Sequence, residues 1–292
     1  MAVSSLQVRI LRFVIGILVA MAITVALAVW FSTSNHSNEQ IDSNLSTAES
    51  TLQQLLRNRE DQLLSSAEVL TSDFGFKQAA ATRDQETIKS VLHNHGERIG
   101  ADLMALLSLQ GELLASDTEQ INTQFNQDYF IRASLSNGGA NDYLVMNGRL
   151  YQVILLPVKA PLPIAIAMVG FELNQNLANQ WQELTGLDIT FYANDQLNRT
   201  VIASTLPATD WALAVDEAYV PYSTKRLPLF GRPQFATLQL ELNQANQNEA
   251  GIFLSYPVEK AFREFDLLQW RIIVITLIGA LLAVAGGLII TR

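Results

Sequence analysis

An uncharged, apolar run lies near each end of the sequence, and a long segment of mixed polar and apolar positions separates the two. The first run, residues 13–31, has Thr24 as its only polar side chain, and the second, residues 272–290, has only Thr276. About 18–20 apolar residues form a helix that crosses about 30 Å of hydrocarbon. The pattern therefore predicts two transmembrane helices, one at each run.

Basic residues near the two runs predict the orientation in the membrane. Arg9 and Arg12 precede the first run with no acidic residue beside them, and Arg292 follows the second run. Cytoplasmic flanks carry an excess of Lys and Arg. The first run is long for a signal peptide and no small-x-small cleavage site follows it, so we expect an uncleaved anchor. We predict a two-pass protein of the bacterial inner membrane, with cytoplasmic ends at 1–12 and 291–292 and a periplasmic region at 32–270.

A long helix is predicted directly after the first run, over residues 32–75. No Pro or Gly occurs before Gly75, and apolar residues recur at helical spacing with one phase shift. These positions are Ile41, Leu45, Ala48, Leu52, Leu55, Leu56, Leu63, Ala67, Leu70 and Phe74. Such a stripe can pair with a second copy of itself, giving a homodimer through the long helix, or it can pack on the domain that follows. Both interpretations remain open at this point.

Two modules of strand-like runs follow the long helix. The first, residues 76–173, is predicted to contain a helix, two strands, a second helix and three strands. Gln110-Gly111 and Asn147-Gly148 are its predicted turns, and Asn-Gly between two strand-like runs is a strong hairpin signal. Antiparallel strands with helices on one side of the sheet define an α+β fold.

The second module, residues 174–257, is predicted to be smaller. It starts with a helix that ends at Gly186, continues with a hairpin over Asn194-Asp195, and ends with two more strands. A helix over 258–271 is then expected to lead into the second apolar run. The helix–hairpin opening resembles that of the first module in architecture only, because no residue-level repeat is visible.

Composition excludes several classes of function. The formal net charge is −9, and an acidic exterior argues against nucleic acid as a partner. With no cysteine, the chain forms no disulfide and has no thiolate chemistry. His93 and His95 lie two residues apart, which does not place them on one helix face, so we predict no metal site and no cofactor. No motif of a hydrolase, metalloprotease or nucleotide-binding loop is present, and we predict that the chain is not an enzyme.

Aromatic and basic residues gather around the predicted Asn147-Gly148 hairpin and the helix before it. If the sheet has a concave face, such side chains could hold an anionic or amino-acid-like ligand. They could equally line a solvated strand face. The candidate ligand-binding residues are Tyr129, Arg132, Tyr143, Arg149, Tyr151 and Lys159.

The order of these elements resembles the double Cache sensor domains of bacterial transmembrane signal transducers, whose modules are PAS-like. Residues 73–117, DFGFKQAAATRDQETIKSVLHNHGERIGADLMALLSLQGELLASD, resemble the opening of the first module. Residues 156–173, LPVKAPLPIAIAMVGFEL, resemble the strand pair that closes it. Residues 258–281, VEKAFREFDLLQWRIIVITLIGAL, resemble the exit helix and second span found in sensor kinases and in GGDEF/EAL cyclic-di-GMP enzymes.

The resemblance implies a sensor that binds a small ligand and passes a conformational change to the second membrane span. In that family the second span continues into a linker and a cytoplasmic output domain, such as a kinase or a cyclic-di-GMP enzyme, which we expect this chain to lack. The arginine, tyrosine and aspartate motif of amino-acid-binding members is not recognisable, so the ligand stays open. The alternative is a structural or interaction protein whose ectodomain binds a periplasmic partner protein.

Overall fold

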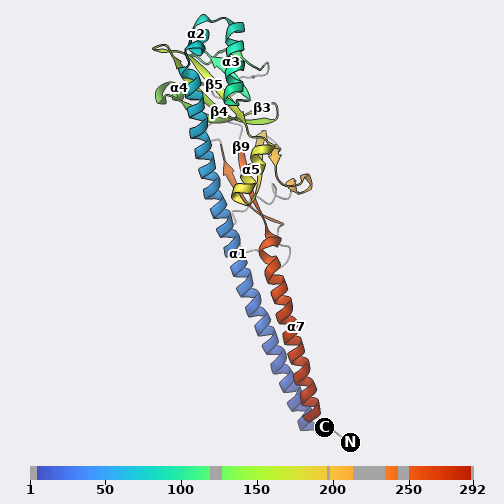
Figure 1. Cartoon of the computed structure of the whole chain (residues 1–292). Helices are drawn as coiled ribbons and strands as arrows, with labels where there is room; N and C mark the ends of the chain where they lie inside the picture. The colour runs from blue at the N-terminus through green and yellow to red at the C-terminus, as the bar shows by residue number, and fades with distance from the viewer. Residues whose placement is uncertain (1–4, 119–126, 196–197, 213–233, 243–249, 291–292) are drawn as a thin grey trace. The chain divides into compact units, whose positions relative to one another are not determined.

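A computed structural model describes residues 5–118, 127–195, 198–212, 234–242 and 250–290. Figure 1 labels the helices and strands along the chain. The chain divides into two compact units. One consists of Leu45–Tyr219 and Thr237–Ser255, and it contains both β-sheets. The other consists of Met1–Asn44, Val220–Ala236 and Tyr256–Arg292.

The long helix predicted from the apolar stripe is present as α1, Ser5–Ser72. Most of the stripe is buried within the chain itself, which confirms the interpretation that it packs on its own domain. These buried positions are Ile41, Leu45, Ala48, Leu52, Leu63, Ala67 and Leu70. Phe74 is the exception, because 80% of its surface is exposed, so its assignment to the stripe was wrong.

The reason for the exception is a helix break at Asp73. The backbone of Asp73 is extended, and its carboxylate accepts a hydrogen bond of 3.0 Å from the Phe76 backbone N–H. A carboxylate in this position caps the start of a new helix. That helix is α2, Phe74–Thr82, and the change of direction turns Phe76, rather than Phe74, into the core. Helix α3, Gln85–Ile99, follows with Asp84 as its cap.

The first sheet is antiparallel throughout, with strand order β2-β1-β5-β4-β3. Its strands are β1 Leu103–Leu107, β2 Leu113–Ser116, β3 Ala140–Met146, β4 Arg149–Lys159 and β5 Pro163–Glu172. The predicted hairpin at Asn147-Gly148 joins β3 to β4. Both residues have positive φ, 51° and 74°, as a two-residue hairpin turn of this kind requires.

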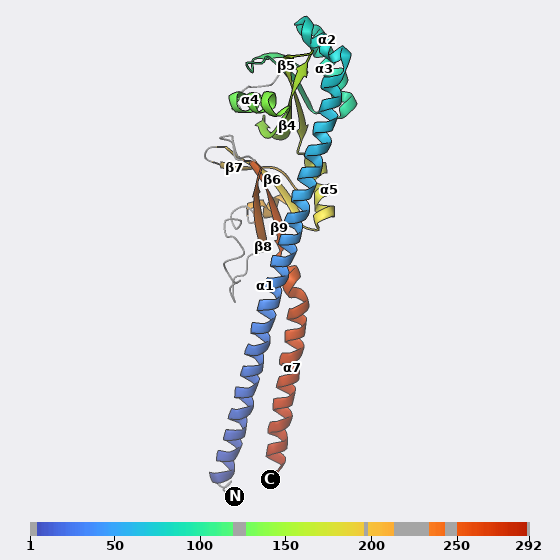
Figure 2. The same cartoon turned by 90° about the vertical axis from the view of Figure 1, so that its left-hand side faces the viewer.

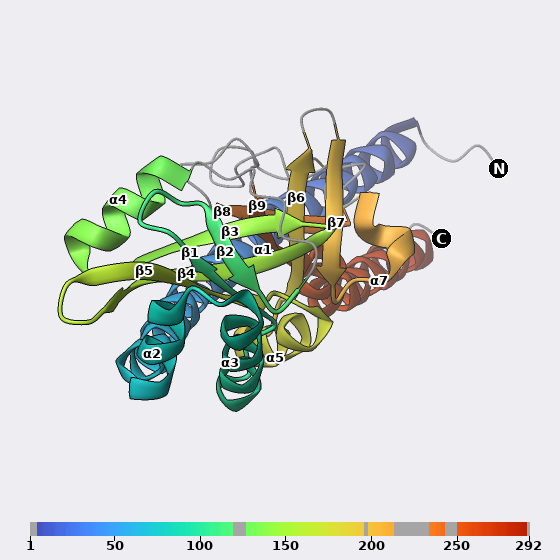
Figure 3. The same cartoon turned by 90° about the horizontal axis from the view of Figure 1, so that it is seen from above.

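Helices cover both faces of the first sheet, as Figures 2 and 3 show. On one face, side chains of α1, α2 and α3 such as Leu70, Phe76 and Leu92 pack on the sheet. On the other face, Phe130 and Ile131 of α4, Gln127–Asn137, pack on the sheet. The expectation of helices on one side only was therefore wrong. Burial of the whole central stretch of β4, from residue 150 to 158, is the consequence.

The second sheet has strand order β7-β6-β9-β8, with α5 on one face. Its elements are α5 Gln175–Thr185, β6 Asp188–Asp195, β7 Asn198–Ser204, a 3-10 turn at Ala208–Asp210, β8 Phe235–Glu241 and β9 Ala250–Pro257. The predicted stop of α5 at Gly186 is confirmed. The hairpin turn is not over Asn194-Asp195, because both residues pair with β7 and extend the ladder.

The predicted exit helix and second apolar run form one helix, α7, Val258–Ile290. Its first N–H donates to the Gln234 carbonyl oxygen, and the Ser37 hydroxyl of α1 donates to the Ala261 carbonyl oxygen. No helix in the part of the chain that the structure describes has the length and hydropathy to cross a membrane. The spans predicted at 13–31 and 272–290 are thus not confirmed and stay predictions.

The helix break at Asp73 predicts unequal roles for two phenylalanines in α2. Phe76→Ala should lower the free energy of unfolding by about 3–5 kcal/mol, because a ring that is 2% exposed leaves a cavity. Phe74→Ala, the matched control, should change it by less than about 0.5 kcal/mol. Thermal or urea denaturation of the two variants measures the difference. Equal losses would contradict the described path of the chain at Asp73.

Candidate functional site

The six candidate residues lie in four separate places on the first module. Arg149 and Tyr151 lie together at the start of β4. Tyr143 lies on β3 and points to the opposite face, since its register partner is Gln152. The remaining three, Tyr129, Arg132 and Lys159, are exposed and belong to neither group.

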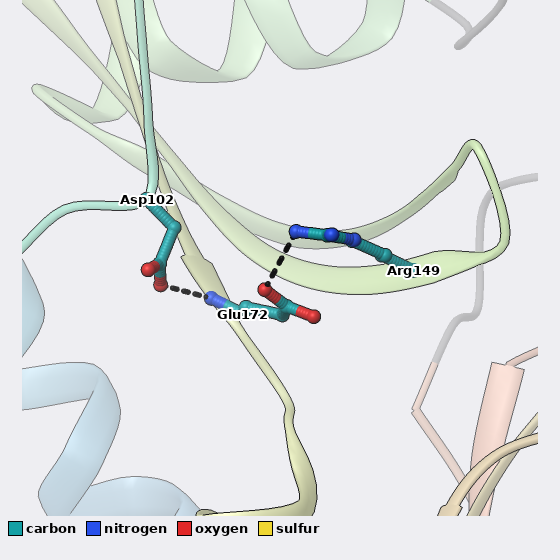
Figure 4. A network of polar contacts seen from close by, with 3 residues as sticks. All are labelled: Asp102, Arg149 and Glu172. Atoms are coloured by element: carbon teal, nitrogen blue, oxygen red, sulfur yellow. Dashed lines mark hydrogen bonds and ion pairs between the residues drawn. The ribbon is translucent and has the colours of Figure 1, made fainter.

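The group at the start of β4 is a network of charged and polar side chains, drawn in Figure 4. Arg149 Nη1 lies 3.4 Å from Glu172 Oε2 in an ion pair. The Glu172 backbone N–H donates a hydrogen bond of 2.7 Å to Asp102 Oδ2. Tyr151, the register partner of Glu172, shares a hydrogen bond with Arg149. The site therefore combines an arginine, two carboxylates and a phenol at one end of three neighbouring strands, β4, β5 and β1.

Charge and burial act differently on the members of this network. Glu172 raises the pKa of the Arg149 guanidinium, and the hydrogen bond with Tyr151 acts in the same direction. Burial raises the pKa of the Tyr151 phenol, and the Glu172 carboxylate raises it further. Arg149 is 63% exposed at its side chain whereas Glu172 is 20% exposed. At neutral pH the site thus presents an accessible cation held by a mostly covered anion.

Glu172 also marks the place where the chain leaves the first sheet. It is the last residue of β5, and the next N–H, that of Leu173, donates to the Leu150 carbonyl oxygen. Asn174 follows and caps α5 by accepting a hydrogen bond of 3.1 Å from the Leu177 N–H. Only Leu173 therefore lies between Glu172, whose carboxylate pairs with Arg149, and Asn174, which caps the first helix of the second module.

Tyr143 belongs to a second polar group, on the face that packs on α1. Arg59 Nε donates to Gln152 Oε1 at 3.1 Å, and Gln152 Nε2 lies 3.3 Å from Asn141 Oδ1. Gln152 is fully buried, and burial lowers the pKa of Arg59 although the neighbouring Tyr143 raises it. Burial also raises the pKa of the Tyr143 phenol. This group ties the long helix to the sheet by side-chain hydrogen bonds.

The other three candidates have no described contact with the Arg149 network. Lys159 is at the opposite end of β4, which at about 3.3 Å per residue places it about 30 Å from Arg149. Tyr129 is 58% exposed on α4 and contacts the edge of the adjacent Phe130 ring at 5.2 Å. Arg132 is exposed on the same helix. No described contact brings these three together.

Sequence reasoning missed the acidic partners of the site. Glu172, Asp102 and the buried Asp142 are not among the six candidates named from the sequence. Asp142 lies within β3 and is only 9% exposed. Burial raises the pKa of its carboxyl to about 6. The one available signal was position: an acidic residue inside an otherwise apolar strand seldom lies there for solubility alone.

The histidines take part in local contacts rather than in a shared site. His93 Nε2 lies 3.6 Å from Glu97 Oε1 on the exposed side of α3. His95 Nε2 lies 3.8 Å from Asp73 Oδ1, and its ring meets the edge of Phe76. Within the described ranges, no three His, Cys, Asp or Glu side chains are placed to hold a metal ion.

One long helix followed by two antiparallel sheets, each with its own helices, is the architecture of a double sensory domain. The chain belongs to the dCache_3 family, the double sensory domain of two-component sensor kinases, whose model matches residues 38–219, more than half of the sequence. This confirms the resemblance to double Cache domains. No curated protein matches the sequence.

Solved structures that match this chain include domains of sensor kinases and chemoreceptors. The Vibrio cholerae histidine kinase DctB sensor domain is 14% identical, with a TM-score of 0.43, and the match covers 75% of this chain and 96% of that one. The Pseudomonas fluorescens chemoreceptor CtaA ligand-binding domain, solved with L-leucine, is 16% identical, with a TM-score of 0.39 and coverage of 80% and 99%. The Campylobacter jejuni chemoreceptor Tlp3 domain, solved with L-norvaline, is 13% identical, with a TM-score of 0.41 and coverage of 79% and 94%.

The raised pKa of Asp142 predicts a specific pH dependence of stability. Between pH 3.8 and about 6, the folded protein holds a proton at Asp142 that the unfolded chain has released. The free energy of unfolding should therefore fall as the pH rises through this window, and Asp142→Asn should remove that fall. Thermal unfolding of both proteins at pH 4.5 and 7.5 measures it.

Asp84→Asn is a comparison variant, because Asp84 affects the pH dependence of the free energy of unfolding with the opposite sign. Hydrogen bonds from the side chain and the backbone N–H of Thr87 lower the pKa of Asp84. Its stabilising contribution is therefore present above the pKa of the unfolded chain and is lost as the pH falls. If Asp142→Asn kept the pH dependence of the natural protein, Asp142 would not be the buried acid described above.

Proposed function

We propose that the chain is the extracytoplasmic input region of a bacterial transmembrane receptor, and that it binds a small ligand carrying a carboxylate at Arg149. The observation that supports this is the ion pair of Arg149 with Glu172 at the point where β5 leaves the first sheet. The region acts by binding rather than by catalysis, in keeping with the sensory family to which it belongs.

The ion pair of Arg149 and Glu172 is suited to an exchange in which a ligand carboxylate replaces Glu172 on the guanidinium. An ion pair with one exposed member contributes about 0–1 kcal/mol, so replacing Glu172 by a ligand carboxylate costs little. The guanidinium offers a planar fork of donors that fits a carboxylate in two-point contact. Tyr151 lies beside it as a further hydrogen-bonding group.

A ligand carboxylate on Arg149 would release the side chain of Glu172. The release would change the path of the chain from β5 into the second module. In the structure, the side chain of Glu172 is held by Arg149 and its N–H by Asp102. The ligand would favour the arrangement in which Glu172 is released, by as much as its affinities for the two arrangements differ. Asn174 and the start of α5 follow within three residues, so the change would reach the second module through the main chain.

The remaining parts of the proposal concern the membrane and the output. Residues 13–31 and 272–290 would be the two spans, with both termini in the cytoplasm and residues 32–270 in the periplasm. Because α7 is continuous from Val258 to Ile290, a shift at the second sheet would pass along one helix into the second span. The receptor would act as a homodimer and control a kinase or a cyclic-di-GMP enzyme.

One observation favours the alternative of a protein partner. Val69 and Phe74, on either side of the helix break, are 70% and 80% exposed. Large apolar side chains that are exposed together mark contact surfaces when the apolar patch is contiguous and large. The ligand experiment below separates the two functions.

A ligand screen tests the proposed site. The full chain in detergent is screened by thermal shift against amino acids, organic acids, polyamines and nucleobases. We expect a carboxylate ligand to raise the melting temperature, since about 2.7 kcal/mol is gained at 100 times its Kd. Arg149→Ala should abolish the shift, and Lys159→Ala, a basic residue at the other end of β4, should preserve it. If no carboxylate ligand lost its shift with Arg149→Ala, the site would be refuted, and no ligand at all would favour a protein partner.

Cysteine labelling tests the topology, and the absence of natural cysteine makes single-cysteine variants direct. Ser65→Cys, at an exposed position of α1, should react with a membrane-impermeant maleimide in intact spheroplasts. Ser4→Cys, before the first apolar run, should react only after lysis. Labelling of both positions in intact spheroplasts, or of neither, would contradict the proposed orientation.

A further inference from the structure

The two faces of the second sheet differ in chemistry. The face toward α5 is apolar, and Trp181 of α5 meets Phe191 edge-on at 5.6 Å between ring centroids. The opposite face carries hydroxyls, amides, an arginine and two aromatic rings. Successive strand residues point to opposite faces, so this second set shares one side of the sheet. Its central members are Thr190, Tyr192, Arg199, Ser204, Gln239 and Phe253.

Two stacked rings form the floor of this polar face. Tyr192 and Phe253 are fully buried, with ring centroids 4.3 Å apart and planes at 19°. The Tyr192 ring reaches over Gly251 of the neighbouring strand β9, where any Cβ atom would clash with its hydroxyl. That reach lets Gln239 of β8 donate a hydrogen bond of 2.7 Å to the Tyr192 hydroxyl. Residues of three strands, β6, β8 and β9, therefore hold the two rings in place.

The hydroxyls on this face are buried and already paired. Thr190 Oγ1 lies 2.6 Å from Ser204 Oγ, and Thr237 Oγ1 lies 3.2 Å from Ser255 Oγ. All four residues are less than 9% exposed. Burying polar groups costs stability unless they are hydrogen-bonded, and apolar side chains would serve a core equally well. The face is thus a preorganised polar surface inside the module.

Arg199 supplies the charge on this surface. Its guanidinium carbon lies 5.1 Å from the Tyr192 ring centroid and 5.2 Å from that of Phe253. Its Nε donates a hydrogen bond of 3.1 Å to Asn194 Oδ1. Among the residues that the structure describes, no carboxylate forms an ion pair with it. Arg199 is half-buried, and two ring faces and an amide oxygen hold its guanidinium in place.

We propose that this face of the second sheet is a second binding site, separate from the one at Arg149, and that it takes a small monocarboxylate on the guanidinium of Arg199. Asn194 and the stacked rings hold the guanidinium by its Nε and its plane. The two terminal amino groups of an arginine form the fork that binds a carboxylate in two-point contact. Arg199 is the only basic residue of β6, β7, β8 and β9, which fits one carboxylate rather than two.

Calorimetric titration of the full chain in detergent with propionate tests the site. Propionamide, which has the same shape without the charge, is the matched control ligand. We expect propionate to bind and propionamide to bind at least about tenfold more weakly, the effect of losing a hydrogen bond to a charged group. Arg199→Gln should weaken propionate binding by at least about tenfold, whereas Arg149→Ala should leave binding at Arg199 in place.

Arg199→Lys is a second variant, which keeps the test decisive if Arg199→Gln does not fold. It keeps the positive charge but loses the planar fork, so it should bind propionate more weakly than the natural protein while still preferring it to propionamide. No binding of propionate to the natural protein, equal binding of propionamide, or binding lost with Arg149→Ala but not with Arg199→Gln would each overturn the second site. Failure of the Arg149 site alone would leave the Arg199 titration unchanged, so the two proposals are tested separately.

Discussion

Burial of both faces of the first sheet is the constraint on which the rest of the structure depends. An antiparallel sheet can leave one face in water, and then its strands alternate between apolar and polar residues. Here β4 is buried from residue 150 to 158, because α1, α2 and α3 cover one face and α4 covers the other. Polar groups can therefore remain accessible mainly at the strand ends, where Arg149 and Glu172 are found.

The same constraint explains the two polar groups that remain inside the first module. Gln152 is buried against α1, and it is tolerated because Arg59 and Asn141 both lie within hydrogen-bonding distance of its side chain. Asp142 is buried nearby in β3, and its carboxyl responds with a pKa raised to about 6. At Gln152 hydrogen bonds offset the cost of burial, whereas at Asp142 the effect of burial on the pKa exceeds that of the hydrogen bond with the Tyr143 backbone.

Local signals in the sequence predicted local structure well. Asn147-Gly148 predicted its hairpin because the turn requires positive φ at both residues, and Gly186 predicted the end of α5 for a similar reason. The break at Asp73 could not be placed from the apolar spacing, since Phe74, four residues after Leu70, continues the helical pattern of the stripe. The site was only half predicted: Arg149 and Tyr151 are close in sequence, whereas Asp102 and Glu172 join them through strand pairing across 70 residues, which leaves no local pattern.

Gly251 carries a consequence for how the second module can change in evolution. The Tyr192 hydroxyl occupies the space that any side chain at position 251 would need. The Leu240 carbonyl oxygen of the adjacent strand β8 would lie 2.6 Å from the same Cβ atom, so loss of the Tyr192 ring alone does not make room for alanine. Position 251 is thus restricted to glycine by a side chain and by a neighbouring backbone, and a substitution at 192 does not release it.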